Sequence, residues 1–108
     1  MVLTNLLNNA FFTVLEKAKL FRDVVPEVTI STIFTDSNFE IHIRDNGRGI
    51  NATEMKQLFS PFFTTKPTAK GTGLGLYLSQ DIIKEHKGNI SVNTKEGEYT
   101  EFIIVIPK

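Results

Sequence analysis

The sequence lacks cysteine and tryptophan, and it has no excess charge of either sign. Without cysteine, a disulfide framework and a thiolate metal centre are both excluded. Twelve Lys and Arg balance twelve Asp and Glu, so no long-range field draws the chain to nucleic acid or to an acidic membrane. The longest apolar run, at 102–106, is far shorter than the roughly 20 residues that span a bilayer. We therefore expect neither a nucleic-acid partner nor direct membrane contact.

The length of 108 residues favours one domain around one core. Hydrophobic periodicity predicts helices over 2–20, 53–59 and 74–87, the last ending at Gly88, and strands over 28–34, 39–43, 90–94 and 99–106. These elements predict an α/β two-layer sandwich in which a mixed, mostly antiparallel sheet of about four strands packs against the helices. Because no N-cap precedes Met1, we expect the domain, residues 1–108, to be shortened at its N-terminus.

The first chemical motif is Asp45-Asn46-Gly47-Arg48-Gly49-Ile50, directly after a predicted strand. A carboxylate at the floor of a pocket can accept the amino hydrogen of adenine. Residues without a Cβ let the backbone approach a flat ring closely, which suits Gly47 and Gly49. The alternative is an ordinary strand-to-helix turn, because short glycine motifs recur by chance.

A second glycine motif, Gly71-Thr72-Gly73-Leu74-Gly75-Leu76, opens the third predicted helix. Unpaired backbone N–H groups and the positive end of the helix dipole attract phosphate at such a position. The motif is neither a dinucleotide fingerprint nor a protein-kinase glycine loop, since both need glycine where Leu76 stands. The alternative is a flexible hinge at the start of a helix.

Asn5 and Asn9 lie four residues apart, so they share one face of the first helix with Phe12 and Glu16. Neutral amide oxygens can ligand magnesium without overloading a site that a triphosphate already charges. The alternative is a solvated face, although the aromatic ring of Phe12 argues against it.

An aromatic cluster at 58–63 is followed by Lys66 and Lys70, within the segment that separates the two glycine motifs. The rings can anchor the base of a mobile loop, and either lysine can reach a phosphate. The alternative is a small satellite core with solvated lysines.

In this order, the four motifs resemble the histidine-kinase branch of the GHKL ATPase family, and the resemblance covers nearly the whole chain. The segment 5–10 is similar to the N box of that family, 45–49 to its first glycine box, 59–63 to its F box and 71–75 to its second glycine box. One such match is a weak signal, whereas four in sequence are a strong one. The resemblance implies a Bergerat-type ATP-binding fold.

The resemblance also implies the cofactors ATP and Mg²⁺ and a role for each matching residue. Asn9 would ligand magnesium, Asp45 would select adenine, and residues 51–73 would form a mobile ATP lid. The nucleotide would be bound by Asn9, Asp45, Gly47, Gly49, Ile50, Phe63, Thr65, Lys66, Lys70, Gly71, Thr72, Gly73, Leu74 and Gly75. Phe12 stands where many members carry a basic residue, so we expect another residue, Lys66 or Lys70, to meet the phosphate charge.

The activity implied is that of a protein histidine kinase, which donates the γ-phosphate of ATP to a histidine on a separate dimerisation domain and signals to a response regulator. The location implied is cytoplasmic, within a longer protein that can be anchored in the inner membrane. Hydrolysing members of the superfamily carry glutamate where this chain has Asn5, which cannot act as a general base, so phosphotransfer is preferred and Asn5 is the candidate catalytic residue. A third reading is a non-enzymatic nucleotide-binding or docking module. His42 and His86 are interpreted as structural.

Overall fold

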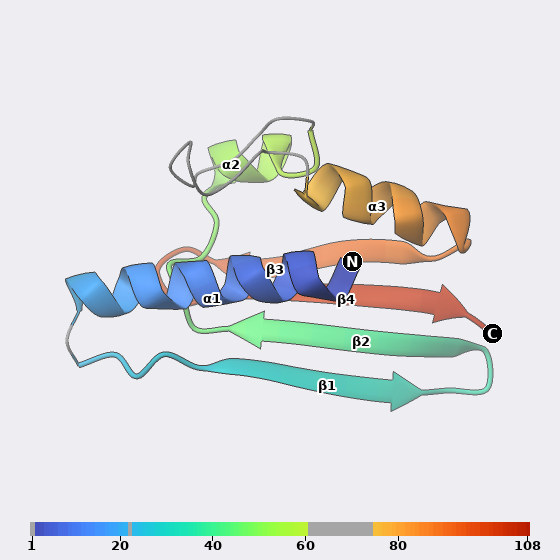
Figure 1. The fold of residues 1–108 in the computed structure, drawn as a ribbon, viewed down its shortest axis with the longest axis horizontal. Helices are drawn as coiled ribbons and strands as arrows, with labels where there is room; N and C mark the ends of the chain where they lie inside the picture. Colours follow the sequence, from blue (N-terminus) through green and yellow to red (C-terminus); the bar gives the residue numbers. More distant parts are fainter. Residues whose placement is uncertain (1, 22, 61–74) are drawn as a thin grey trace.

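The computed structural model describes residues 2–21, 23–60 and 75–108, in which helices and strands follow the predicted order (Figure 1). The helices are α1 (Val2–Leu20), α2 (Ala52–Gln57) and α3 (Gly75–Glu85). The strands are β1 (Val28–Phe34), β2 (Asn38–Asp45), β3 (Asn89–Lys95) and β4 (Tyr99–Pro107). None of the described helices has the length and apolar character needed to cross a membrane.

The strands form one sheet in the order β1-β2-β4-β3, so β4 lies between β2 and β3. Every pairing among the four described strands is antiparallel, whereas a mixed, mostly antiparallel sheet was expected. In the register of the two central strands, Asp45 lies opposite Thr100 and Ile43 opposite Phe102. The return of β4 between β2 and β3 is the part of the topology that strand periodicity alone does not predict.

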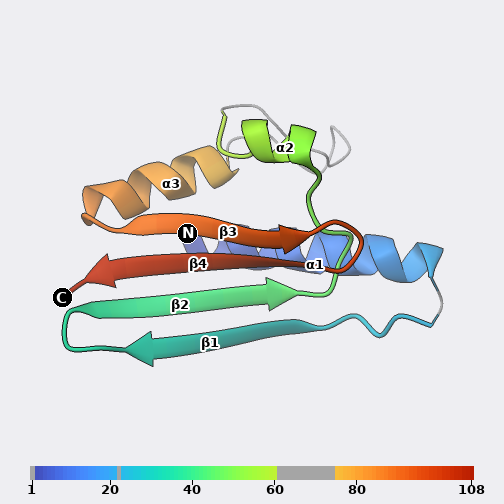
Figure 2. The ribbon, with the colours of Figure 1, turned by 180° about the vertical axis from the view of Figure 1, so that it is seen from behind.

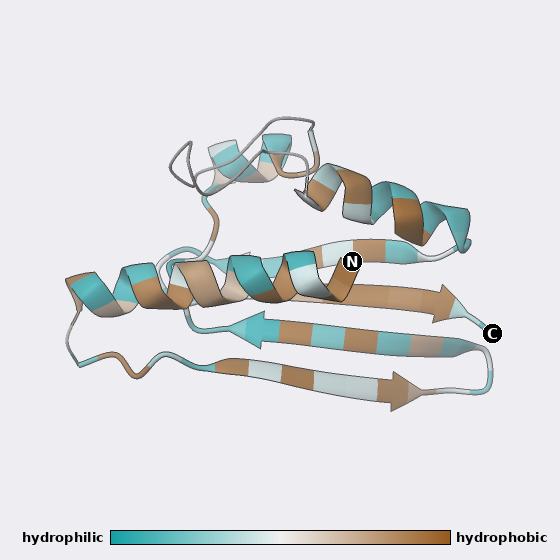
Figure 3. Ribbon diagram, in the orientation of Figure 1, coloured by the Kyte–Doolittle hydropathy of each residue, from teal (hydrophilic) through white to brown (hydrophobic). Residues whose placement is uncertain are grey.

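The helices and the sheet form two layers, which confirms the predicted two-layer sandwich, here an α+β fold with an antiparallel sheet. Helix α1 runs along the central strands, and α3 lies beside β3 and the N-terminal half of α1, as seen from both sides (Figures 1 and 2). Brown and teal alternate along β2, so one face of that strand is apolar and the other polar (Figure 3). Between the layers is one core, made of Leu6, Ala10, Ile43, Leu58, Ile83, Ile90, Phe102 and Ile104.

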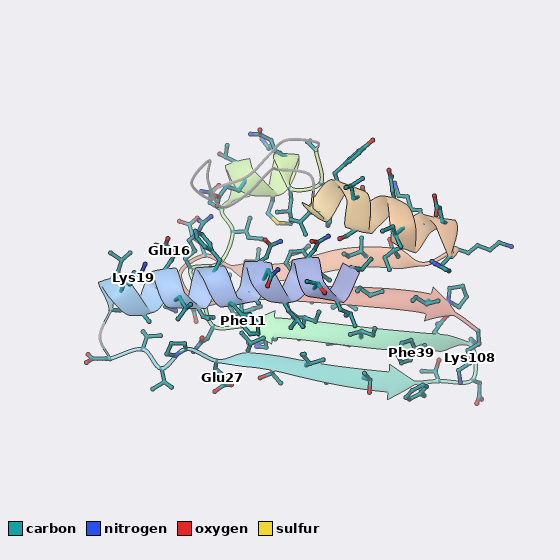
Figure 4. All side chains as sticks on the ribbon, viewed as in Figure 1. Phe11, Glu16, Lys19, Glu27, Phe39 and Lys108 are labelled. Atoms are coloured by element: carbon teal, nitrogen blue, oxygen red, sulfur yellow. The ribbon has the colours of Figure 1, made fainter. Side chains whose placement is uncertain are left out.

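Strand β1 packs less closely than the other strands, because only Val28, at its start, is partly buried against the core and the rest of the strand is exposed. Ile30 and Phe34 are 52% and 70% exposed, and Phe11 of α1 is 49% exposed. In Figure 4, Phe11 lies on the edge of α1 that faces β1 and β2, while Phe39 and Lys108 lie together at the far end of the sheet. The alternation of β1 correctly predicts a strand, but not its burial.

Both ends of α2 and of α3 differ from the predicted boundaries, and at the start of α2 and the end of α3 the reason is local. Helix α2 begins at Ala52 because the side chain of Asn51 accepts a hydrogen bond from the backbone N–H of Glu54 at 2.8 Å, and the side chain of Glu54 accepts from the Asn51 N–H in return. Helix α3 ends at Glu85, and the residue after it that adopts the left-handed region is Lys87, at φ 62°, and not Gly88. Gly88 is needed for space, since a Cβ there would lie 2.6 Å from the Val105 carbonyl oxygen.

Candidate functional site

Asp45 ends β2 on the side of the sheet that carries α1, and it is 3% exposed. Its Oδ1 accepts a hydrogen bond from the backbone N–H of Gly47 at 2.9 Å. Burial raises the pKa of the Asp45 carboxyl to about 6, although the Gly47 hydrogen bond and the positive charge of Lys17 act in the opposite direction. A buried acceptor that ionises near neutral pH is suited to take a hydrogen bond from an amino group.

The two glycines after Asp45 are each required for a different reason. A Cβ on Gly47 would lie 2.5 Å from Oγ1 of Thr13 and 2.9 Å from Oδ1 of Asp45, so the helix and the carboxylate leave no room for a side chain. Gly49 has a φ of 72°, and a Cβ there would lie 2.5 Å from the carbonyl oxygen of Lys95. The loop 45–50 is therefore packed tightly between α1 and the β3–β4 turn.

The backbone of this loop is held by contacts from elements far away in sequence. The Arg48 N–H donates to Oγ1 of Thr13 at 3.1 Å, and the Arg48 carbonyl accepts from the Gly97 N–H at 2.6 Å. The Ile50 N–H donates to Oγ1 of Thr94 at 3.0 Å. Donors and acceptors of the protein itself thus hold the backbone of the loop in place.

The side chain of Arg48 extends the same loop toward α2. Its two guanidinium nitrogens donate to the two carboxylate oxygens of Glu54 at 3.1 and 2.9 Å. This two-point ion pair lowers the pKa of Glu54, which also caps the start of α2. After α2 the chain returns to the core at Leu58, which is buried, and at Phe59, which packs against it.

The asparagine face of α1 is partly buried, and at Asn5 it lies against α3. Nδ2 of Asn5 donates to the Gly75 carbonyl oxygen at 3.4 Å and to Oγ of the fully buried Ser79 at 3.3 Å. Asn9, one turn further along α1, is half-buried. The face therefore turns toward the first turn of α3, where the second glycine motif ends.

The structure brings the described candidate residues into two groups, which α1 connects. Asp45, Gly47, Gly49 and Ile50 form one group beside Thr13, and Asn5 and Gly75 form the other. Outside the described residues lie Phe63, Thr65, Lys66, Lys70, Gly71, Thr72, Gly73 and Leu74. The roles of those residues, and of the ATP lid as a whole, stay predictions.

Three threonines at the site were missed by the sequence interpretation. Thr13 and Thr94 accept hydrogen bonds from the loop, and Thr100 is buried opposite Asp45 in the β2–β4 register. The hydroxyl of Thr94 donates to the Tyr99 carbonyl oxygen at 2.9 Å. Only Thr13 has a signal in the sequence, since it follows Asn9 by one helical turn. The other two are recognisable only once the strand pairing is known.

Both histidines lie away from these groups. His42 is on the outer face of β2, with Nε2 3.0 Å from Oε1 of Glu40 and Nδ1 3.9 Å from Oε1 of Glu101. His86 follows the last residue of α3 and is exposed. That both histidines are structural stays a prediction.

Comparison with known proteins relates the whole chain to one family. The family model described as histidine kinase-, DNA gyrase B-, and HSP90-like ATPase matches residues 1–108. The chain is 42% identical over 107 residues to the signal transduction histidine-protein kinase AtoS of Escherichia coli K12, an alignment that covers 98% of this chain and 16% of that protein. Two relatives from Bacillus subtilis 168 also align over 98% of this chain. Sporulation kinase E is 39% identical over 106 residues, which cover 13% of that protein. A probable C4-dicarboxylate sensor kinase is 40% identical over 109 residues, which cover 19% of that protein.

The chain therefore spans less than a fifth of the length of these relatives. It has the four-stranded α+β sandwich, the buried aspartate followed by two required glycines, and the paired asparagines on the helix above them. With the family model matched from the first residue to the last, the chain belongs to the histidine kinase-, DNA gyrase B- and HSP90-like ATPase family.

Proposed function

We propose that this chain is the ATP-binding catalytic domain of a sensor histidine kinase, which binds magnesium-ATP and donates the γ-phosphate to a histidine on a separate dimerisation domain. The observation that carries the proposal is the buried carboxylate of Asp45, fixed by the Gly47 N–H at 2.9 Å beneath a loop whose backbone is already ordered. The kinase names of the relatives support the reaction class. A response regulator is the proposed recipient of the phosphoryl group afterwards.

Asp45 is proposed to recognise the base. An adenine amino group donates to a carboxylate, whereas guanine presents a carbonyl oxygen at the same edge and would be repelled. Because Asp45 is 3% exposed, little water competes for the carboxylate. The close packing at Gly47 and Gly49 fixes the backbone of the loop, which is proposed to lie beside the base.

Asn9 is proposed to hold the metal. Its amide oxygen is a hard, neutral ligand of the type that magnesium accepts, and its half-buried position on α1 is on the same face as Asn5. When bound, the ion offsets negative charge on the triphosphate. The second glycine motif, which ends at Gly75 beside Asn5, is proposed to bind the phosphates through backbone N–H groups.

Asn5 is proposed to orient the incoming histidine of the dimerisation domain. Its Nδ2 donates to the Gly75 carbonyl and to Ser79, so the amide oxygen is the atom that offers an acceptor to an imidazole N–H. An imidazole held by one nitrogen presents the lone pair of the other to the γ-phosphorus. The N–P bond then forms as the bond from that phosphorus to the β–γ bridging oxygen breaks, and ADP leaves.

The test is a set of calorimetric titrations of ATP into the chain, with and without magnesium. Asp45→Asn should abolish measurable ATP binding, since the amide exchanges an acceptor for a donor at the base. Asn9→Ala should weaken magnesium-ATP much more than metal-free ATP. Matched controls are Asp36→Asn in the exposed β1–β2 turn and Asn8→Ala on the exposed side of α1. Unchanged affinity of Asp45→Asn would refute the assignment of the base site, and equal losses for Asn9→Ala would refute the metal role.

A further inference from the structure

Two side chains of α1, one helical turn apart, reach the loop that carries Asp45 and the β3–β4 turn beside it. Oγ1 of Thr13 accepts from the Arg48 N–H at 3.1 Å, and Nζ of Lys17 donates to the Gly97 carbonyl oxygen at 2.8 Å. The Gly97 N–H in turn donates to the Arg48 carbonyl oxygen at 2.6 Å, so Gly97 contacts both Lys17 and the loop. These three hydrogen bonds join α1, the loop and the β3–β4 turn, which are distant in sequence.

Gly47 lies between the two hydrogen bonds that fix this part of the loop, and without a side chain its backbone has more conformations open to it than that of another residue. The peptide group before it is held by the bond from the Gly47 N–H to Oδ1 of Asp45. The peptide group after it is held by the bond from the Arg48 N–H to Thr13. If the second bond is lost, the Gly47 backbone can rotate, and the first bond, which orients the carboxylate, is no longer constrained.

We infer that Thr13 is a positioning residue for nucleotide recognition: its hydroxyl holds the Gly47–Arg48 peptide so that the Asp45 carboxylate is oriented before the base arrives. The inference rests on the proposed ATP-binding function. Pre-ordering matters because a loop that must be ordered during binding reduces the affinity by the free energy of that ordering.

The position of Thr13 also connects the base end of the site with the metal end. Thr13 follows Asn9 by one turn of α1, and Asn9 follows Asn5 by one turn, so all three project along one side of a rigid element. One helix thus sets the spacing between the residue that anchors the base loop and the residue proposed to hold magnesium. The hydrogen bonds from Lys17 to Gly97 and from Gly97 to Arg48 fix the loop relative to the same helix.

The experiment compares Thr13→Val with Thr13→Ser. Valine has the shape of threonine without the acceptor oxygen, whereas serine keeps the oxygen and loses only the methyl group. ADP, titrated by calorimetry well below the melting temperature, is the probe. We expect Thr13→Val to bind about threefold to tenfold more weakly, as the loss of one hydrogen bond predicts, and Thr13→Ser to stay within about twofold of the unmodified chain. Thr4→Val, an exposed site on the same helix, is the control and should not change binding.

A second readout needs no nucleotide. Amide hydrogen exchange at Arg48 should be faster in Thr13→Val and unchanged in Thr13→Ser, while the melting temperatures of the two variants show whether each is folded. A role in stability alone would lower the melting temperature without weakening ADP binding by the folded variant.

The inference is overturned if folded Thr13→Val binds ADP as tightly as the unmodified chain. It is also overturned if Thr13→Ser loses as much affinity as Thr13→Val, because the methyl group and not the hydroxyl would then be responsible. If the unmodified chain binds no adenine nucleotide, the proposed function itself fails and this inference fails with it. The Arg48 exchange data distinguish that result from an error about Thr13 alone.

Discussion

Asp45 places an ionisable carboxyl group inside the core, so the stability of the nucleotide-free chain depends on pH. Its pKa rises from 3.8 to about 6 on folding, because burial disfavours the charged form. Between these two values the folded chain binds more protons than the unfolded chain, and the free energy of unfolding falls as the pH rises through about 4 to 6. At neutral pH the penalty is on the order of 3 kcal/mol, from about 1.36 kcal/mol per pKa unit.

Asp45→Asn should therefore stabilise the empty chain while removing ATP binding. The amide oxygen still accepts from the Gly47 N–H, and the buried charge is gone. We expect a gain of about 1 to 3 kcal/mol near pH 7.5, which shrinks as the pH falls from about 6 to 4 and disappears below about pH 3, where the aspartate is protonated in both states. Urea denaturation across this range measures it, with Asp36→Asn as the control for an exposed aspartate. If the free energy of unfolding depends on pH in the same way in Asp45→Asn as in the unmodified chain, the prediction is wrong.

Two glycines with left-handed backbones provide a matched pair of substitutions. Gly49→Ala combines a φ of 72° with a Cβ 2.5 Å from the Lys95 carbonyl, so the β3–β4 turn must move away from the loop. Gly97→Ala has a φ of 82°, and its Cβ meets no atom within 4 Å. We expect about 1 to 2 kcal/mol of destabilisation for Gly97→Ala, from backbone strain alone, and a clearly larger loss for Gly49→Ala. Thermal unfolding of the two variants tests the order, and equal losses would refute it.

At the scale of elements, helix α2 is held in place by the Arg48 side chain of the loop 45–50 and by its N-cap residue, Asn51. Glu54 accepts from Arg48 at two oxygens and from the Asn51 N–H, and its side chain is 14% exposed. Because these donors lower the pKa of Glu54, its contribution to stability is present above its unfolded pKa of 4.5 and is lost as the pH falls through the lower folded value.

Glu54→Ala should release α2 from the loop and cost about 1 to 2 kcal/mol, as expected for a lost cap and a partly buried ion pair. Amide hydrogen exchange should accelerate within Ala52–Gln57 and remain unchanged in the central strands. Gln57→Ala, an exposed change in the same helix, is the control. Exchange in α2 that is as slow in Glu54→Ala as in the unmodified chain would count against this anchor.

At the scale of the whole molecule, the chain with magnesium-ATP should not phosphorylate itself. His42 is on the outer face of the sheet, opposite the side that carries α1 and Asp45, and His86 lies beyond the end of α3. Neither histidine can approach a phosphate bound near α1 and the first turn of α3, because phosphoryl transfer needs the acceptor in line with the leaving oxygen.

Radiolabelled ATP is the measurement, applied to the chain alone and to the chain mixed with a histidine-bearing dimerisation domain from its parent protein. We expect label on the added domain only, and slow phosphate release, because the neutral amide of Asn5 cannot act as a general base toward water. His42→Gln and His86→Gln serve as controls for weak self-labelling. Strong labelling of the isolated chain at either histidine would refute the proposed division of roles.

The sequence by itself determined the elements, their order and the family. Hydrophobic alternation predicted β1, and helical spacing predicted α1, because both patterns are local. The motif at 45–50 and the asparagines of α1 were recognisable because their residue types carry the chemistry directly.

Only the tertiary structure decided how these parts meet. The place of β4 between β2 and β3 brings Thr100 opposite Asp45, and no local pattern encodes that register. The pKa of Asp45 is a product of burial by distant segments, and Thr13 became part of the site only when α1 packed on the loop. The exposure of β1 likewise could not be predicted from its alternating sequence. Alternation indicates that a strand has two distinct faces, but not whether a helix covers one of them. Periodicity is a property of neighbours along the chain, whereas electrostatics and hydrogen-bond geometry depend on neighbours in space.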